Sequence, residues 1–331
     1  MAILISDSFK IRESTSDEWE DILFSINSPG VPPGGTAGQM LTKTGPSDYA
    51  TAWHTLNGGG PNLLDNWYFV GGGSQLGYGV FPINQRGQTV YTGEGYCIDR
   101  WRANGSFTLA SDGISIGSDV VLCQRISNIN ALVGKQLSFS VLTANELITA
   151  SFVFSIQTIN YAVTDDFAIG YITSLGGFTI YARNANAIKI LSAKLEIGST
   201  QTLAHQENGV WVLNEIPDYG EELANCQRYY YRLVEDAYGT YAIGFIADDN
   251  NRASFIIQHP VPMATVPTPN YIGSFGINTT QFGDATHYYT RGNNMKANLT
   301  FTANYNVPRG TVAALQDRGN GNTVIEFSAD L

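Results

Sequence analysis

Charged side chains are scarce in this chain, and the few that it has are mostly acidic. Asp, Glu, Lys and Arg together make up 14% of the 331 residues, with 18 basic against 29 acidic residues and a formal net charge of -11. A partner with a phosphate backbone would need clustered Lys and Arg, so we expect no nucleic acid binding. Low charge together with 12% aromatic residues favours β-structure over helical bundles.

Cysteines are few, and long apolar runs are missing. Cys97, Cys123 and Cys226 lie far apart without CxxC spacing, and they predict free, buried thiols. The four histidines are equally scattered, so neither residue type indicates a metal or a cofactor. No run reaches the roughly 18 apolar residues of a membrane span, and residues 1–13 do not form a signal peptide. We therefore expect synthesis in the cytoplasm and no membrane insertion.

Glycine and tyrosine are abundant, with 35 and 18 residues, and β-prone runs alternate with turn signals from Asn62 onward. This cadence predicts a mainly β chain with two tandem antiparallel β-sandwich domains of the jelly-roll type. The predicted parts are an anchoring segment at 1–30, a Gly/Pro-rich junction at 31–60, a sandwich at 61–200, a connector at 201–225 and a second sandwich at 226–331.

The first 30 residues contain one helix-like pattern. Ser16 is placed as an N-cap, and four apolar residues follow at i, i+3, i+4 and i+7 spacing: Trp19, Ile22, Leu23 and Ile26. A lone helix of this length is marginal in water, so we expect it to dock on another chain or to nucleate a trimer. An ordinary helix packed against its own domain is the alternative.

The junction contains two short β-compatible segments. Gly38–Lys43 alternates in polarity, and Ala50–Thr55 places Trp53 among β-compatible residues. We expect a small hairpin, or β-structure between chains around a threefold axis, with Tyr49 and Trp53 as aromatic anchors.

Motifs for catalysis are weak. The segment 113–117 matches the GxSxG nucleophile elbow around Ser115, but its surroundings predict a strand flanked by glycine turns instead of a turn into a helix. Adjacent acids on a strand or turn point in different directions and do not make a catalytic pair. The turn 248–251 lacks the spacing of a calcium loop. We expect no catalytic residues and no enzyme.

Exposed tyrosines are the better candidates for binding. Sugar recognition uses flat aromatic faces on a β-scaffold, and the candidates for glycan contact are Tyr230, Tyr238, Tyr241, Tyr288 and Tyr289. In a strand, Tyr229 and Tyr231 share one face and Tyr230 takes the other, so at least one of the three belongs to the core. Packing in a core or interface is the alternative for each of these tyrosines.

Several segments, in this order along the chain, resemble parts of the fibre and receptor-binding proteins of tailed bacteriophages. The first is 32–53, with GGT at 34–36, GQMLTK at 38–43, Asp48-Tyr49 and Trp53. The others are 62–66, 82–87, Tyr96 with 98–101, 194–198, 219–223, 226–230, 262–263 and 267–268. Segments within 62–198 look like the start and the closing strand of a carbohydrate-binding-module-like jelly roll.

The resemblance implies a homotrimer on the virion surface. Its N-terminus would attach to another virion protein, and its β-domains would adhere to a host-surface glycan. Asn84, Arg86, Asp99 and Arg100 are expected to fix turns and buried salt bridges. A tail or baseplate location is favoured; a capsid head fibre or decoration protein and a glycan depolymerase or esterase are the alternatives.

Overall fold

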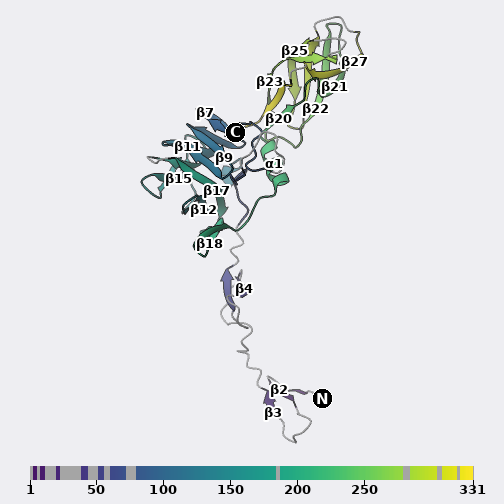
Figure 1. Cartoon of the computed structure of the whole chain (residues 1–331). Helices are drawn as coiled ribbons and strands as arrows, with labels where there is room; N and C mark the ends of the chain where they lie inside the picture. The colour runs from purple at the N-terminus through teal and green to yellow at the C-terminus, as the bar shows by residue number, and fades with distance from the viewer. Residues whose placement is uncertain are drawn as a thin grey trace. The chain divides into compact units, whose positions relative to one another are not determined.

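The structure is a computed structural model, and it describes residues 3–5, 8–11, 20–22, 39–43, 51–55, 60–71, 80–183, 187–278, 284–303, 308–318 and 321–330. The chain divides into two units, Met1–Gly59 and Gly60–Leu331. Every strand pair in the described residues is antiparallel, and the fold is mainly β (Figure 1). The described residues include no helix long and apolar enough to cross a bilayer.

The N-terminal unit contains two small sheets. The first has three short strands, β1 (Ile3–Ile5), β2 (Ser8–Ile11) and β3 (Glu20–Ile22). The helix expected here is therefore wrong for residues 20–22, where backbone pairing of β3 with β2 replaces helical hydrogen bonds. Ile22 belongs to β3, whereas Trp19, Leu23 and Ile26 lie outside the described residues.

The second small sheet confirms the hairpin in the junction. β4 (Gln39–Lys43) pairs with β5 (Thr51–Thr55), and Leu41 lies opposite Trp53. Both side chains are half-buried. Tyr49 lies outside the described residues.

Two six-stranded sheets form the first β-domain, as the sequence predicted. One sheet has the order β13 (Leu147–Val153), β12 (Gln136–Thr143), β17 (Ile188–Ile197), β10 (Gly113–Ile116), β9 (Phe107–Ala110) and β6 (Val90–Tyr91). The other has the order β14 (Ile159–Ala162), β15 (Phe167–Ile172), β16 (Gly177–Ala182), β11 (Val120–Gln124), β8 (Trp101–Asn104) and β7 (Glu94–Ile98). A 3₁₀ helix, η1 (Ile129–Leu132), connects β11 to β12.

The core of the sandwich is rich in aromatic rings. In β13 buried and exposed residues alternate, which places Phe152 inside and Val153 outside, as period-2 patterning requires. Phe139 from one sheet meets Phe178 from the other edge to face, with ring centres 5.9 Å apart. Fully buried rings of this kind each remove roughly 150–250 Å² from water, so they dominate the stability of the domain.

The connector contains regular structure that the sequence did not predict. β18 (Ala204–Glu207) and β19 (Val210–Leu213) form a hairpin, and α1 (Tyr219–Gln227) is the one α-helix in the described residues. Asp218 caps α1, because its side chain accepts a hydrogen bond from the backbone N–H of Glu221 at 2.9 Å.

The C-terminal β-domain is a closed barrel with a small sheet beside it. The barrel has the order β21 (Thr240–Ile246), β22 (Arg252–Gln258), β26 (Lys296–Ala303), β25 (Asp284–Gly292), β24 (Phe275–Ile277) and β27 (Val312–Asp317). The small sheet has the order β20 (Tyr230–Val234), β28 (Val324–Ser328) and β23 (Thr268–Ile272).

Both parts of the C-terminal β-domain contribute to one core. Phe255 and Phe301 from the barrel pack in the same cluster as Tyr231 and Phe327 from the small sheet. The antiparallel β-domain expected at 226–331 is present, and pairing of β21 with β27 refines it from a two-sheet sandwich to a closed barrel.

Candidate functional site

The residues that carry the resemblance to phage proteins fix loops and charges inside Gly60–Leu331. The side-chain oxygen of Asn84 accepts hydrogen bonds from the backbone N–H groups of Gly87 and Gln88 at 3.0 and 3.3 Å. Arg100, in the turn between β7 and β8, has a left-handed backbone (φ 72°), and its Nε donates to Asp65 at 2.8 Å. The prediction that these residues fix turns and buried salt bridges is confirmed.

Two arginines of the sandwich stack on tyrosines at the start of the C-terminal β-domain. The guanidinium carbon of Arg86 lies 3.8 Å from the ring centre of Tyr230, and that of Arg100 lies 3.5 Å from the ring centre of Tyr229. Desolvated stacks of this kind are worth about 2 kcal/mol each. They join the sandwich to the strand that begins the C-terminal β-domain.

Tyr230 is not available for glycan contact, so its prediction as a sugar-binding residue is wrong. Its side chain is 3% exposed, and its hydroxyl donates to Glu326 at 2.8 Å. Burial raises its pKa above the usual value, which keeps it a hydrogen-bond donor. Tyr229 and Tyr231 are buried as well, so all three consecutive tyrosines are structural.

Two carboxyl groups are buried where the sandwich, α1 and the C-terminal β-domain meet. Asp99 lies 3.7 Å from Arg86 Nε and accepts from Gln85 Nε2 at 2.9 Å, yet burial dominates and raises its pKa to about 6. Glu222 of α1 accepts from the backbone N–H of Asn66, and burial raises its pKa to about 7. Removal from water disfavours the charged form of both groups.

The other predicted tyrosines do not form one site. Tyr238 and Tyr288 are 58% and 52% exposed, whereas Tyr241 is half-buried and its hydroxyl donates to the Thr323 carbonyl at 2.5 Å. Tyr288 lies at a β-bulge of β25 that turns its side chain outward, while the side chain of Tyr289 lies outside the described residues. Tyr238 precedes β21, which is not a neighbour of β25 in the barrel.

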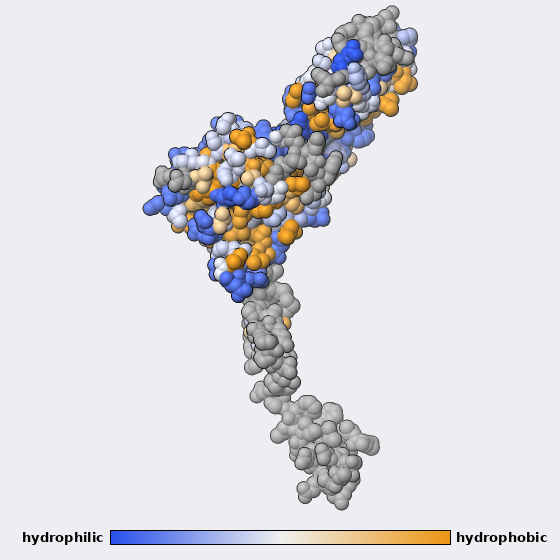
Figure 2. Space-filling model, in the orientation of Figure 1, coloured by the Kyte–Doolittle hydropathy of each residue, from blue (hydrophilic) through white to orange (hydrophobic). Residues whose placement is uncertain are grey.

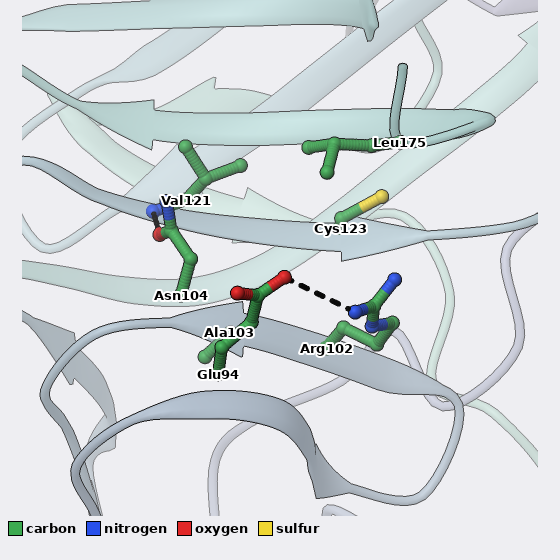
Figure 3. A pocket seen from close by; sticks show the side chains of 7 residues that line it. All are labelled: Glu94, Arg102, Ala103, Asn104, Val121, Cys123 and Leu175. Carbon is green, nitrogen blue, oxygen red and sulfur yellow. Dashed lines mark hydrogen bonds and ion pairs between the residues drawn. The ribbon is translucent and has the colours of Figure 1, made fainter. Parts of the chain in front are cut away.

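A small pocket lies on the outer face of the sandwich, over β7, β8 and β11 (Figure 3); Glu94, Arg102 and Asn104 are its polar residues, and most of its wall is apolar, from Ala103, Val121, Cys123 and Leu175. Glu94 and Asn104 are opposite each other in the pairing of β7 with β8, and Arg102 shares their face because side chains alternate along a strand. Arg102 Nη2 lies 3.4 Å from Glu94 Oε1, and Asn104 Oδ1 accepts from the backbone N–H of Val121 at 2.6 Å. Figure 3 shows Glu94 and Arg102 turned toward one another.

The size and charge of this pocket suit a hydroxyl group. Its volume is about 20 Å³, and a water molecule needs roughly 10–15 Å³ by this measure. The pocket is therefore large enough for one hydroxyl group. The Glu94 carboxylate can accept a hydrogen bond from a hydroxyl, and the Arg102 guanidinium can donate one to it. The two charges balance, so the pair does not favour a charged ligand over a neutral one.

Other candidate chemistries lose their geometric basis. Ser115 lies in the middle of β10, which pairs with β9 and β17, so no strand-to-helix elbow forms there. Burial raises the pKa of the Cys123 thiol to about 11, so it is protonated at neutral pH. All three cysteines are free and buried, as predicted. Among the described residues, no group of three His, Cys, Asp or Glu side chains could hold a metal ion.

Sequence reasoning missed the pocket residues Glu94, Arg102 and Asn104. The available signal is the alternation of polar and apolar residues on the two strands that flank the turn at Asp99 and Arg100. Comparison of the chain with protein-family models, curated proteins and solved structures gives no match. The functional interpretation therefore depends on the geometry of the described residues and on the resemblance of the quoted segments.

Proposed function

We propose that this protein is a structural, non-enzymatic fibre of a phage virion, a homotrimer that adheres to host cell-surface glycans through its β-domains. The tail or baseplate is its favoured location, and its N-terminal residues attach to another virion protein. The separate unit Met1–Gly59, whose described residues form short strands, supports an attachment role for that part. The larger unit Gly60–Leu331 carries both β-domains.

The observation that carries the adhesive role is the sandwich pocket, in which the polar residues Glu94, Arg102 and Asn104 lie beside an apolar wall. It offers both hydrogen-bond acceptors and hydrogen-bond donors on a β-sheet, and proteins orient the hydroxyls of a sugar with such groups. A single shallow contact of this kind binds weakly. Three copies on one particle compensate, because each later contact forms at a high effective concentration.

An apolar patch on the barrel supports self-association. Ile243 and Phe245 of β21, Ile256 of β22 and Val312 of β27 are 53 to 71% exposed, and Phe245 pairs directly with Val312. These three strands are neighbours in the barrel, and hydrophobic residues are visible on its surface in Figure 2. Contiguous exposed apolar side chains mark interaction surfaces.

Adhesion is tested by binding the full-length protein to arrays of bacterial surface glycans. Arg102→Met is expected to weaken binding to the recognised glycan about tenfold, which corresponds to about 1.4 kcal/mol per site. Lys189→Met, a change of a half-buried cation on the other sheet, is the control and should leave binding unchanged. Equal binding by the wild type and Arg102→Met would place recognition elsewhere.

Trimer formation is tested by light scattering of the full-length protein. We expect a mass three times the 35.9 kDa of one chain, reduced toward one chain by Phe245→Lys because a charge in a buried apolar interface is costly. Val153→Lys, at an exposed apolar position of the sandwich, is the control and should retain the trimer. A monomeric wild type would refute the fibre.

A further inference from the structure

The C-terminal β-domain contains a cavity of about 90 Å³ that no part of the proposed function uses. It lies where β22, β25 and β26 end beside β28, and it has room for about six water molecules. The apolar part of its wall consists of Val266, Pro267, Pro269, Gly292, Ala297 and Phe327. The polar part consists of His259, Thr290, Asn293 and Lys296.

His259 places a hydrogen-bond donor in this wall. The side chain is 8% exposed, and its Nδ1 lies 2.6 Å from the hydroxyl of Tyr231. Burial raises the pKa of Tyr231, so this hydroxyl stays protonated, and donation to Nδ1 satisfies both atoms. Burial also lowers the pKa of His259, which keeps the ring neutral, and the proton of the neutral ring is then on Nε2.

This Nε2–H donor has no well-aligned acceptor among the residues that the structure describes. Within the described part of the chain, no atom meets the geometric criteria for a hydrogen bond with it. The Asn293 backbone raises the pKa of His259, but by less than burial lowers it. A buried donor without an acceptor costs about 1–3 kcal/mol. An acceptor atom brought into the cavity would recover that cost.

The charge of the cavity indicates what kind of acceptor fits. Lys296 is exposed at the rim and has no acidic partner within the described residues, and the residues that line the cavity include no Asp or Glu. Thr290 is held in place by hydrogen bonds of 2.5 Å to Tyr271 and 2.9 Å to His287. The cavity therefore combines a cation, a neutral donor and a rigid polar wall with apolar surfaces.

We propose that this cavity binds the carboxylate of a sugar acid. The carboxylate accepts the hydrogen bond of His259 Nε2–H and lies near the ammonium of Lys296. The C–H face of the sugar ring lies on Pro267 and Pro269, and Asn293 bonds a hydroxyl. The site is separate from the sandwich pocket and goes beyond the adhesion proposed there, because its unbalanced charge selects an anionic ligand.

Calorimetric titration of the full-length protein with monosaccharides tests the site. Galacturonate and glucuronate are expected to bind with a dissociation constant on the order of 1 mM, in the range of small ligands with few polar contacts. Glucose and acetate should bind at least tenfold more weakly. Lys296→Gln should weaken uronate binding at least fivefold, whereas Lys135→Gln, an exposed lysine of the sandwich, should not change it.

A second readout is the NMR signal of the His259 ring in the wild type. Uronate should shift the Nε2–H resonance. If a tri-uronide binds as well, the natural ligand is part of a polysaccharide. If only the monosaccharide binds, the natural ligand is a free sugar acid. Either result supports the site. Three results would overturn it: equal affinity for glucose or acetate, an unchanged Kd in Lys296→Gln, or no uronate binding. None of these results bears on trimer formation or on the Arg102 test.

Discussion

The sandwich and the barrel each present a pocket that combines apolar walls with a few polar side chains, and the two pockets differ in how their charges are matched. In the sandwich Arg102 is paired with Glu94, so the pocket is electrostatically balanced. In the barrel, among the described residues, the ammonium of Lys296 has no acidic partner and the Nε2–H of His259 has no well-aligned acceptor. A balanced pocket favours the hydroxyls of a neutral ligand, whereas an unbalanced one favours an anion. The two domains are therefore suited to different ligands on the same chain.

The two domains also differ in their aromatic cores, and this difference makes them separately observable. All five tryptophans lie at or before Trp211, and the barrel core contains Phe and Tyr instead. Tryptophan fluorescence thus reports on the sandwich and the N-terminal unit, whereas a tyrosine signal reports on the barrel and the sandwich together.

Phe301→Ala is expected to have the largest effect. Phe301 is fully buried and packs against Phe255, Phe275 and Tyr271, so its loss leaves a cavity and costs about 3–5 kcal/mol. In urea unfolding, the loss of the tyrosine near-ultraviolet circular dichroism signal should begin at a lower urea concentration than the change in tryptophan fluorescence.

The matched variant is Phe139→Ala in the sandwich core, which should lower the fluorescence midpoint instead. If Phe301→Ala lowers both midpoints equally, the two domains unfold as one unit, and they cannot be treated as independent.

Glu222→Gln is expected to have an intermediate effect that depends on pH. The folded-state pKa of Glu222 is about 7, above its usual 4.5, so the stabilisation is present below pH 4.5 and is lost as the pH rises to about 7. Asp99, with a pKa of about 6, acts in the same direction. The variant should be about 3 kcal/mol more stable than the wild type at pH 8 and similar at pH 4, because one pKa unit corresponds to about 1.4 kcal/mol.

Urea unfolding at both pH values measures this difference. Glu221→Gln is the control, since it removes a charge from the same first turn of α1 but at an exposed position. Burial of the Glu222 carboxyl group would not be the cause of the pH dependence if the stability of the wild type did not fall between pH 4.5 and pH 7. The same would follow if Glu221→Gln behaved like Glu222→Gln.

Local patterns predicted the strands well and their closure poorly. Strands such as β16 and β22 lie in the stretch from Asn62 onward where β-prone runs alternate with turn signals, and both signals are encoded nearby in the chain. The pairing of β21 with β27 joins segments about 70 residues apart, and no local pattern specifies it. The helix α1 contains Gly220, a poor helix former, and is stabilised by its Asp218 cap and by burial of Cys226.

The binding candidates show the same limit. The three tyrosines at 229–231 are indistinguishable by composition from exposed sugar-binding residues. Residues distant in the chain explain their burial, because arginines stack on Tyr229 and Tyr230 and Phe327 stacks on Tyr231. Glu94 and Arg102 meet because β7 and β8 pair in one register. A shift of one residue would separate them onto opposite faces.

Tyr288→Ala is expected to have the smallest effect, and it tests whether the exposed aromatic rings of the barrel share in adhesion. The guanidinium carbon of Arg252 lies 3.9 Å from the Tyr288 ring centre, and an exposed stack of this kind is worth about 0.5–1 kcal/mol. Urea unfolding should detect that loss, and glycan-array binding should fall no more than about twofold, since the balanced pocket of the sandwich carries recognition. Tyr238→Ala, at the other exposed tyrosine, is the control for removal of a ring. If Tyr288→Ala abolished binding while Arg102→Met retained it, the barrel would be the domain that recognises the host glycan, and the roles assigned to the two pockets would be reversed.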